Sequence, residues 1–227
     1  RRQRQMCIRD SAVTVVWLDS SVLVDRVQDI LPLIPASYAD AYTKNAGNRR
    51  TALEKLAAGL LLRLVLGISD DKQLTRNACG KPYLKQQCGE APRYFNLSDD
   101  EGLVVLAAAN FEIGVDVHCT GIVDSRLMQK MLPGKGYADF LAAPDAEKPL
   151  LFAKAWTALE AKVKCLGTGF VCDYRQHPEL LDGFHVETVQ LSEKYVVSCA
   201  AQNRFSVHIL PWNGSLFQID TPQVLCS

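Results

Sequence analysis

Apolar residues recur at helical spacing along several stretches of the chain, and the clearest stretch begins near Arg49. From Leu53 through Leu66 the leucines stand three or four positions apart, and further apolar residues widen the stripe. This pattern predicts a helix that is buried on nearly every side. Weaker helical spacing predicts helices over 21–31, 36–45, 125–131, 137–143 and 149–166.

Short apolar segments between these helices predict strands. They cover 12–18, 81–84, 94–97, 103–109, 113–117, 184–191, 195–201 and 205–210. A turn at Asn110, Phe111 and Glu112 separates the two segments in the middle of the chain. We therefore expect 103–109 and 113–117 to pair as a hairpin.

The order of helices followed by strands occurs twice, which predicts an α+β fold of two similar subdomains in pseudo-twofold arrangement. We place the first subdomain at 12–109 and the second at 110–227. No residue-level repeat accompanies this order, so the duplication rests on the elements alone. Residues 1–11 form a basic run that suits neither a signal peptide nor a strand, and we interpret them as a non-native, adapter-derived tail.

Composition narrows the class of partners. The 25 basic and 25 acidic side chains cancel, so no overall field favours nucleic acid or anionic lipid. No apolar stretch approaches the roughly 20 residues that a membrane-spanning helix needs. The 8 cysteines form no C-x-x-C pair, which favours reduced thiols and a cytoplasmic protein over a zinc or disulfide framework.

A carboxylate stands in an otherwise apolar predicted strand at Asp116. Strand alternation puts Asp116 and His118 on one face, opposite Val115 and Val117. Gly114 would allow a ligand or a neighbouring chain to approach the backbone closely. The alternative is an Asp at a strand end that faces water.

A second carboxylate, Glu160, lies on the predicted helix 152–166. The apolar stripe of this helix is Phe152, Ala155, Trp156, Leu159 and Val163, and Glu160 falls at its edge, where a carboxylate is partly desolvated. Lys164 stands one turn further on, which is also the spacing of an ordinary surface pair on a helix.

Together these segments resemble the paired signature of the 4'-phosphopantetheinyl transferases, G-[IV]-D-[IVL]-E followed by W-[ST]-x-K-E-[AS]-x-x-K. The matching residues are Gly114, Asp116, Trp156, Thr157, Glu160, Ala161 and Lys164. Upstream, Gly80-Lys81-Pro82 resembles the G-K-P element of the family, and Phe95-Asn96-Leu97-Ser98 resembles its F-N-[IL]-S strand. Chain length and element order resemble the larger, monomeric, surfactin-type branch with two halves.

The resemblance implies transfer of the 4'-phosphopantetheine group from coenzyme A to a serine of an apo acyl or peptidyl carrier protein. It implies a Mg²⁺ site, which Mn²⁺ could also fill, with Asp116, Glu160 and His118 as metal positions, although His118 could equally be a satisfied histidine that binds no ion. Glu160 and Lys164 would be catalytic. Coenzyme contacts would come from Lys81, Ser98, Asp99 and Lys55, with Arg50 as a further candidate, although Lys55 and Arg50 could equally be solvated helix charges.

The chain departs from the family pattern at positions that touch phosphate and metal. His118 stands where an acid is usual, Asp99 where a histidine is usual, and Leu159 where a lysine is usual. Met131-Leu132-Pro133-Gly134 replaces an F-[ST]-x-x-E segment. Two alternatives to an active transferase therefore remain: a catalytically weakened member that binds coenzyme A or a carrier protein, and an unrelated α+β enzyme or interaction module.

Overall fold

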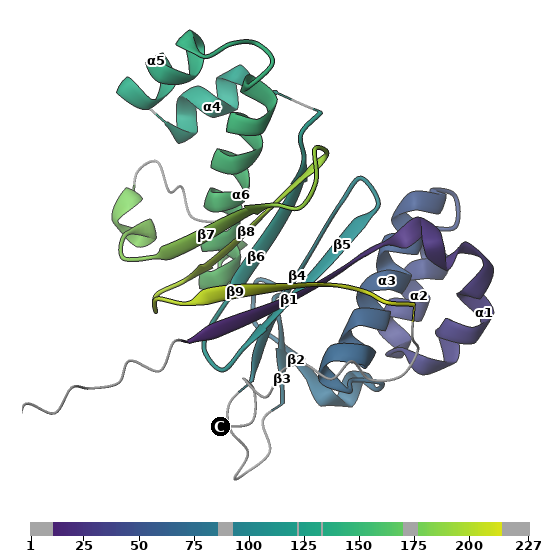
Figure 1. The fold of residues 1–227 in the computed structure, drawn as a ribbon. Helices are drawn as coiled ribbons and strands as arrows, with labels where there is room; N and C mark the ends of the chain where they lie inside the picture. Colours follow the sequence, from purple (N-terminus) through teal and green to yellow (C-terminus); the bar gives the residue numbers. More distant parts are fainter. Residues whose placement is uncertain (1–10, 86–92, 122, 133, 170–176, 215–227) are drawn as a thin grey trace, which may run out of the picture.

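The computed structural model describes residues 11–85, 93–121, 123–132, 134–169 and 177–214, which form a mixed α+β fold with two main sheets (Figure 1). The first sheet has the strand order β4-β5-β1-β9. These strands are β1 (Ala12–Asp19), β4 (Tyr94–Asp100), β5 (Leu103–Ala109) and β9 (Ser206–Pro211). β1 pairs antiparallel with β5 and parallel with β9.

Helices from the first part of the chain cover one face of this sheet. The principal one is α3 (Arg49–Leu66), whose leucines are buried almost throughout, as the spacing predicts. Asn48 caps the start of α3, and Gly67 ends it in the left-handed conformation with a φ of 72°. The other helices here are α1 (Val27–Ile30) and α2 (Ala36–Lys44), with 3-10 turns at Ser20–Arg26, Leu31–Leu33 and Asp71–Gln73.

The predicted helix over 21–31 is mostly wrong, because only α1 is α-helical there. The preceding residues, with the β-branched Val22 and Val24, form a 3-10 turn instead, and Pro32 is the second residue of the next one. β-Branched side chains and proline both disfavour an extended α-helix. A short hairpin of β2 (Leu74–Arg76) and β3 (Pro82–Leu84) follows α3.

The second sheet has the order β6-β8-β7. Its strands are β6 (Gly114–Cys119), β7 (His185–Gln190) and β8 (Tyr195–Ala201). The long helix α6 (Lys148–Leu166) packs on β6 and β8, and α4 (Ser125–Met131) and α5 (Lys135–Ala142) project beyond it (Figure 1). A 3-10 turn at Pro178–Leu181 precedes β7. An apolar layer that includes Val15, Val105, Val115 and Val197 fills the space between the two sheets.

Polar side chains of β4 join the two sheets. Every second residue of β4 accepts a hydrogen bond from a backbone N–H of β6: Asn96 from Val115 at 3.0 Å, Ser98 from Val117 at 3.3 Å and Asp100 from Cys119 at 2.7 Å. β6 is an edge strand whose N–H groups would otherwise lack partners. This ladder therefore fixes the register of β4 against β6.

The predicted hairpin between 103–109 and 113–117 is wrong. β5 turns back onto β4 through the two-residue turn Glu101-Gly102, and β6 crosses to the second sheet. Both turn residues have positive φ, 46° and 91°, as a tight turn of this length requires. The subdomain limits at 109 and 110 stay predictions; β9, from the far end of the chain, completes the first sheet.

In the parts of the chain that the structure describes, no helix is both long and apolar enough to cross a membrane. Four cysteines among the described residues, Cys79, Cys119, Cys165 and Cys199, are free thiols. The remaining cysteines and the tail at 1–10 lie outside the described residues.

Candidate functional site

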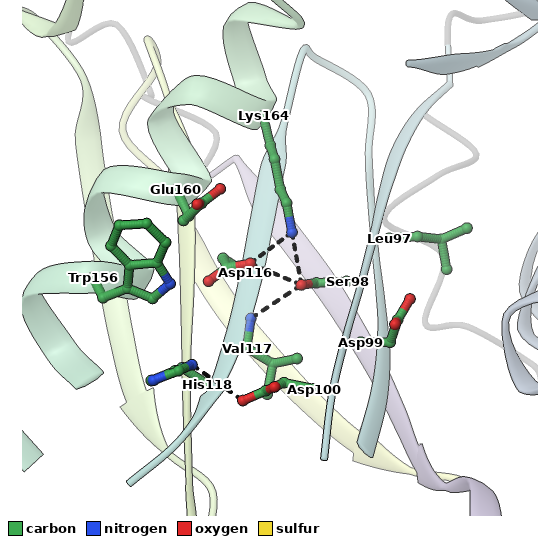
Figure 2. Close-up of a pocket in the computed structure, with 10 residues that line it drawn as sticks. All are labelled: Leu97, Ser98, Asp99, Asp100, Asp116, Val117, His118, Trp156, Glu160 and Lys164. Atoms are coloured by element: carbon green, nitrogen blue, oxygen red, sulfur yellow. Dashed lines mark hydrogen bonds and ion pairs between the residues drawn. The ribbon is translucent and has the colours of Figure 1, made fainter. Parts of the chain in front are cut away.

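A cleft of about 280 Å³ lies where β4, β6 and α6 meet (Figure 2). Its lining residues are Leu97, Ser98, Asp99, Asp100, Asp116, Val117, His118, Trp156, Glu160 and Lys164. Both carboxylates that the sequence singled out are therefore in one site. Of the predicted coenzyme contacts, Ser98 and Asp99 also line it.

Gly114 explains why α6 lies so close to β6. A Cβ atom at this position would overlap the carbonyl oxygen of Ala161 and lie 2.9 Å from the Cα of Cys165. The close approach that the sequence predicts at Gly114 thus involves the helix. The helix also faces the sheet differently from the prediction: Ala153, Thr157 and Ala161 are buried, whereas Trp156 and Leu159 are only half-buried. Trp156, Glu160 and Lys164, spaced one turn apart, face the cleft.

Asp116 is buried, with 5% of its surface exposed, so the alternative of a strand-end carboxylate in water does not hold. Its Oδ1 accepts hydrogen bonds from Ser98 Oγ at 2.8 Å and from Lys164 Nζ at 2.6 Å. Burial raises the pKa of Asp116, and the positive charge of Lys164 counteracts part of that rise.

Glu160 lies beside Asp116 on the helix side of the cleft (Figure 2). Burial, together with the negative charge of Asp116, raises the pKa of Glu160 to about 7. Lys164 lowers it less than burial raises it. At neutral pH this carboxyl group is close to the midpoint of its titration, which suits a group that exchanges a proton or binds a cation.

Lys164 joins the two strands that form the floor of the cleft. Besides Asp116, it donates a hydrogen bond to Ser98 Oγ at 2.7 Å. The pair that the sequence allowed between Lys164 and Glu160 as a surface feature is thus replaced by a bond between Lys164 and a buried carboxylate on β6.

His118 and Asp100 form a second polar pair at the other end of the cleft. His118 Nδ1 lies 3.1 Å from Asp100 Oδ2, and the His118 ring packs edge-on against Phe152 at 5.8 Å between centroids. Sequence reasoning missed Asp100. The available signal was its position two residues after Ser98 on the same strand, which puts both side chains on one face.

Two predicted coenzyme contacts lie elsewhere. Lys81 is buried behind the cleft, where its ammonium group bonds Glu112 Oε2 at 2.9 Å and the carbonyl oxygen of Cys165 at 3.0 Å. The structure thus gives Lys81 a structural role at the end of α6. Lys55 lies across β4 from the cleft and pairs with both oxygens of Asp99, at 3.0 and 3.2 Å. Arg50 pairs with Glu101 at the β4–β5 turn.

The donor groups of the cleft suit a hard cation such as Mg²⁺. Asp116 and Glu160 offer carboxylate oxygens, which Mg²⁺ prefers. The ion pair between Lys164 and Asp116 shows that the Asp116 carboxylate attracts positive charge. Among the described residues, however, no three His, Cys, Asp or Glu side chains converge as a metal-binding cluster. The predicted set of Asp116, Glu160 and His118 is therefore not assembled as three ligands. The geometry fits an ion that keeps several waters.

A sequence model described as the 4'-phosphopantetheinyl transferase superfamily matches residues 112–218. The match covers slightly less than half of the chain, and over this segment the chain is similar to that superfamily. The matched segment contains β6 and α6, and hence Asp116, Glu160 and Lys164, together with the strands of the second sheet. The strand that carries Ser98, Asp99 and Asp100 lies outside it.

Curated relatives carry the name of the same superfamily. The chain is 26% identical over 154 residues to 4'-phosphopantetheinyl transferase gsp of Aneurinibacillus migulanus, and the aligned residues cover 67% of this chain and 59% of the relative. It is 25% identical over 174 residues to pptA of Paxillus involutus, with coverages of 66% and 65%. It is 34% identical over 95 residues to HetI of Nostoc sp., with coverages of 40% and 39%. The chain thus spans less than two thirds of the length of each of these relatives.

Proposed function

We propose that this chain transfers 4'-phosphopantetheine from coenzyme A to a serine of an apo acyl or peptidyl carrier protein. The observation that carries the proposal is the meeting of Asp116, Glu160 and Lys164 in one cleft. These are the residues that match the superfamily signature, and they come from a strand and a helix held in direct backbone contact at Gly114.

The reaction needs little covalent help from a protein. The serine oxygen of the carrier forms a bond to the β-phosphorus of coenzyme A, the bond from that phosphorus to the bridging oxygen breaks, and 3',5'-ADP leaves. Positioning and charge neutralisation supply most of the catalysis in transfers of this kind. Glu160, with a pKa of about 7, is suited to accept the serine proton, directly or through a water.

Positive charge for the pyrophosphate has two sources in this proposal. Lys164 supplies one, from the floor of the cleft. A magnesium ion, when bound, would supply the other by screening the phosphate oxygens, with Asp116 as the residue that holds it and Glu160 either sharing the ion or acting as the base. Asp116 is placed for this role because its second oxygen, Oδ2, accepts no hydrogen bond from the described residues.

A second hollow on the other side of β4 extends the space available to coenzyme A. Leu97 and Asp99 line both hollows, and the second also includes Lys55 and Arg76 with the aromatic ring of Tyr38. In Figure 2 the side chain of Leu97 points away from Asp116 and Glu160. Two cations next to an aromatic and apolar surface suit a phosphorylated nucleoside.

One observation favours the second candidate, a weakened member that binds coenzyme A or a carrier protein without efficient transfer. Asp99 neutralises Lys55 in the second hollow, where a coenzyme phosphate would need a free cation. Equilibrium dialysis with radiolabelled coenzyme A measures binding separately from transfer and so distinguishes the two candidates.

The decisive experiment incubates the protein with coenzyme A, Mg²⁺ and an apo carrier protein, then measures the intact mass of the carrier. We expect the carrier to gain one phosphopantetheine group, and a serine-to-alanine carrier to gain none. Glu160→Gln should abolish the gain. Coenzyme binding without any mass change, across acyl and peptidyl carriers, would establish the second candidate.

A further inference from the structure

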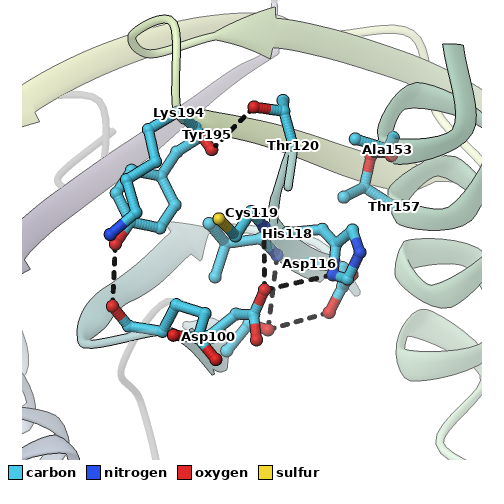
Figure 3. A network of polar contacts seen from close by, with 12 residues as sticks. Asp100, Asp116, His118, Cys119, Thr120, Ala153, Thr157, Lys194 and Tyr195 are labelled. Carbon is cyan, nitrogen blue, oxygen red and sulfur yellow. Dashed lines mark hydrogen bonds and ion pairs between the residues drawn. The ribbon is translucent and has the colours of Figure 1, made fainter. Parts of the chain in front are cut away.

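Asp100 is a pocket carboxylate that neither the signature residues nor the superfamily match includes. It lines the cleft from the end of β4, with 29% of its side chain exposed. The Cys119 amide donates to its Oδ2 at 2.7 Å, and His118 Nδ1 lies 3.1 Å from the same oxygen (Figure 3). Because both contacts with described residues fall on Oδ2, the other oxygen remains able to accept from a ligand in the cleft.

His118 is poorly placed to bind a cation itself. A carboxylate only accepts hydrogen bonds, so Nδ1 must carry a proton and donate it to Asp100. The second nitrogen, Nε2, is buried and has no hydrogen-bond partner among the described residues. The ring also packs edge-on against Phe152. In Figure 2, Nε2 points away from Asp116 and Glu160.

The turn that carries Asp100 is held from three sides. Glu54 Oε1 accepts from the Gly102 amide at 2.8 Å, the Ser20 amide donates to the Gly102 carbonyl at 2.8 Å, and Tyr195 Oη donates to the Glu101 carbonyl at 2.8 Å. Glu101 is the non-glycine residue with positive φ in the described chain. A strained residue persists only where its surroundings fix it. Asp100 is thus a carboxylate whose backbone is held firmly at the edge of the cleft.

We propose that Asp100 is the third acidic group of the cation site and that His118 is a positioning residue, which orients Asp100 through the Nδ1 bond. This inference rests on the proposed function. It decides between the two interpretations that the sequence leaves open for His118, a metal position or a histidine that binds no ion. Groups that do not touch a metal ion directly can still change its affinity. Asp100 would do so by accepting hydrogen bonds from water molecules on the ion, and His118 would do so by holding Asp100 in position.

The test uses Mn²⁺ as the probe, counted by its solution electron paramagnetic resonance signal with purified protein and no coenzyme. Asp100→Asn keeps the shape and can still accept from the Cys119 amide, so the fold should survive; a thermal melt checks this. We expect Asp100→Asn to weaken Mn²⁺ binding about tenfold, the lower end of the effect of a group outside direct coordination. Asp99→Asn is the matched control, because it removes the same charge from the neighbouring residue, which is paired with Lys55. It should change Mn²⁺ affinity by no more than about twofold, because solvent and salt screen a charge that is partly exposed.

Two further measurements test the role of His118. Electron spin echo modulation of bound Mn²⁺ should show no ¹⁴N coupling from imidazole. His118→Phe, which lacks a donor, should weaken Mn²⁺ binding as Asp100→Asn does, and His118→Gln, which keeps an N–H donor, should restore most of it.

Each contrary outcome has one reading. A ¹⁴N coupling that disappears in His118→Gln would overturn the proposal and make His118 a ligand. Native Mn²⁺ affinity in Asp100→Asn would also overturn it, provided that Asp116→Asn abolishes binding. If Asp116→Asn binds Mn²⁺ as the native protein does, the cation site of the proposed function fails as well.

Discussion

Gly114 and Ala161 bring strand β6 and helix α6 into direct backbone contact. A Cβ atom on Gly114 would overlap the carbonyl oxygen of Ala161. Asp116 follows Gly114 by two residues on the strand, and Glu160 directly precedes Ala161 on the helix. The separation of the two carboxylates is therefore set by a contact in which no side chain can adapt.

We expect Gly114→Ala to destabilise the fold by at least about 3 kcal/mol, because the clash is with backbone atoms that cannot rotate away. Urea unfolding measures this. Gly47→Ala is the control, since a Cβ there meets nothing within 4 Å. If the Gly114 variant keeps native stability but loses transfer activity, the helix has moved to make room for the new methyl group. Transfer then depends on the distance between the two carboxylates. Native stability with native activity would contradict the close packing.

Much of this arrangement could be predicted from sequence, because its signals are local. The burial of α3 follows from leucines at helical spacing, and the pairing of Asp116 with His118 on one strand face follows from alternation. The buried face of α6 could not be predicted so well. Phe152 and Val163 of the predicted stripe are buried, but the small residues Ala153, Thr157 and Ala161 are buried with them. A hydrophobicity pattern gives more weight to Trp156 and Leu159, which are only half-buried.

Long-range pairing was outside the reach of the sequence. The expected hairpin of 103–109 with 113–117 depended on their nearness in the chain, but the two-residue turn at Glu101-Gly102 pairs β5 with β4 instead. The polar ladder from β4 to β6 then brings Asp100 to His118. No local pattern shows which polar residues of one strand will meet the amides of another, so sequence reasoning missed Asp100 and gave no sign of the bond between Lys81 and the carbonyl oxygen of Cys165.

Lys81→Met should lower stability by about 2 kcal/mol, because the carbonyl oxygen of Cys165 loses a buried, charged donor. Glu112, the ion-pair partner, has a side chain that is 45% exposed and can be solvated. Lys81 does not line the cleft, and salt screens the effect of a distant charge. We therefore expect the dissociation constant for coenzyme A, measured by equilibrium dialysis, to change by no more than about twofold from the native value. A variant with native stability and weakened coenzyme binding would instead support the sequence assignment of Lys81 to the coenzyme.

Asp99→Asn should tighten coenzyme A binding. The change frees Lys55 from its partner and removes a negative charge from the wall shared by the two hollows. The pair is about one-third exposed, so the expected gain is about twofold to fivefold, the range for an interaction of up to about 1 kcal/mol. The KM for coenzyme A at saturating carrier measures it, and Lys55→Gln should raise that KM. Weaker binding in Asp99→Asn would show that Asp99 contacts the coenzyme directly, as the family resemblance implies.

The raised pKa of Glu160 makes a prediction about stability and pH. The folded protein holds this proton up to a pKa of about 7, whereas the ordinary value is 4.5. Between these values the unfolded chain has released the proton and the folded chain keeps it, so stability falls as pH rises through this window. Above about pH 7.5 the penalty is complete, and below about pH 4.5 it is absent.

Glu160→Gln removes the titrating group and resembles the protonated form. We expect the variant to be more stable than the native protein by about 1 kcal/mol at pH 8, a figure reduced from the full effect of the shift because the carboxyl group is only part-buried and solvent screens it. Near pH 5 the difference should almost vanish. Urea unfolding in EDTA at both pH values measures the difference, and Glu147→Gln, an exposed carboxylate at the start of the same helix, controls for loss of one charge.

Added Mg²⁺ should stabilise the native protein at pH 8 and leave Glu160→Gln nearly unchanged, since binding to the folded state alone raises stability. If Glu160→Gln is more stable than the native protein by the same amount at pH 5 and pH 8, the pKa of Glu160 is not raised in the folded protein. The role of Glu160 as proton acceptor would then lose its basis.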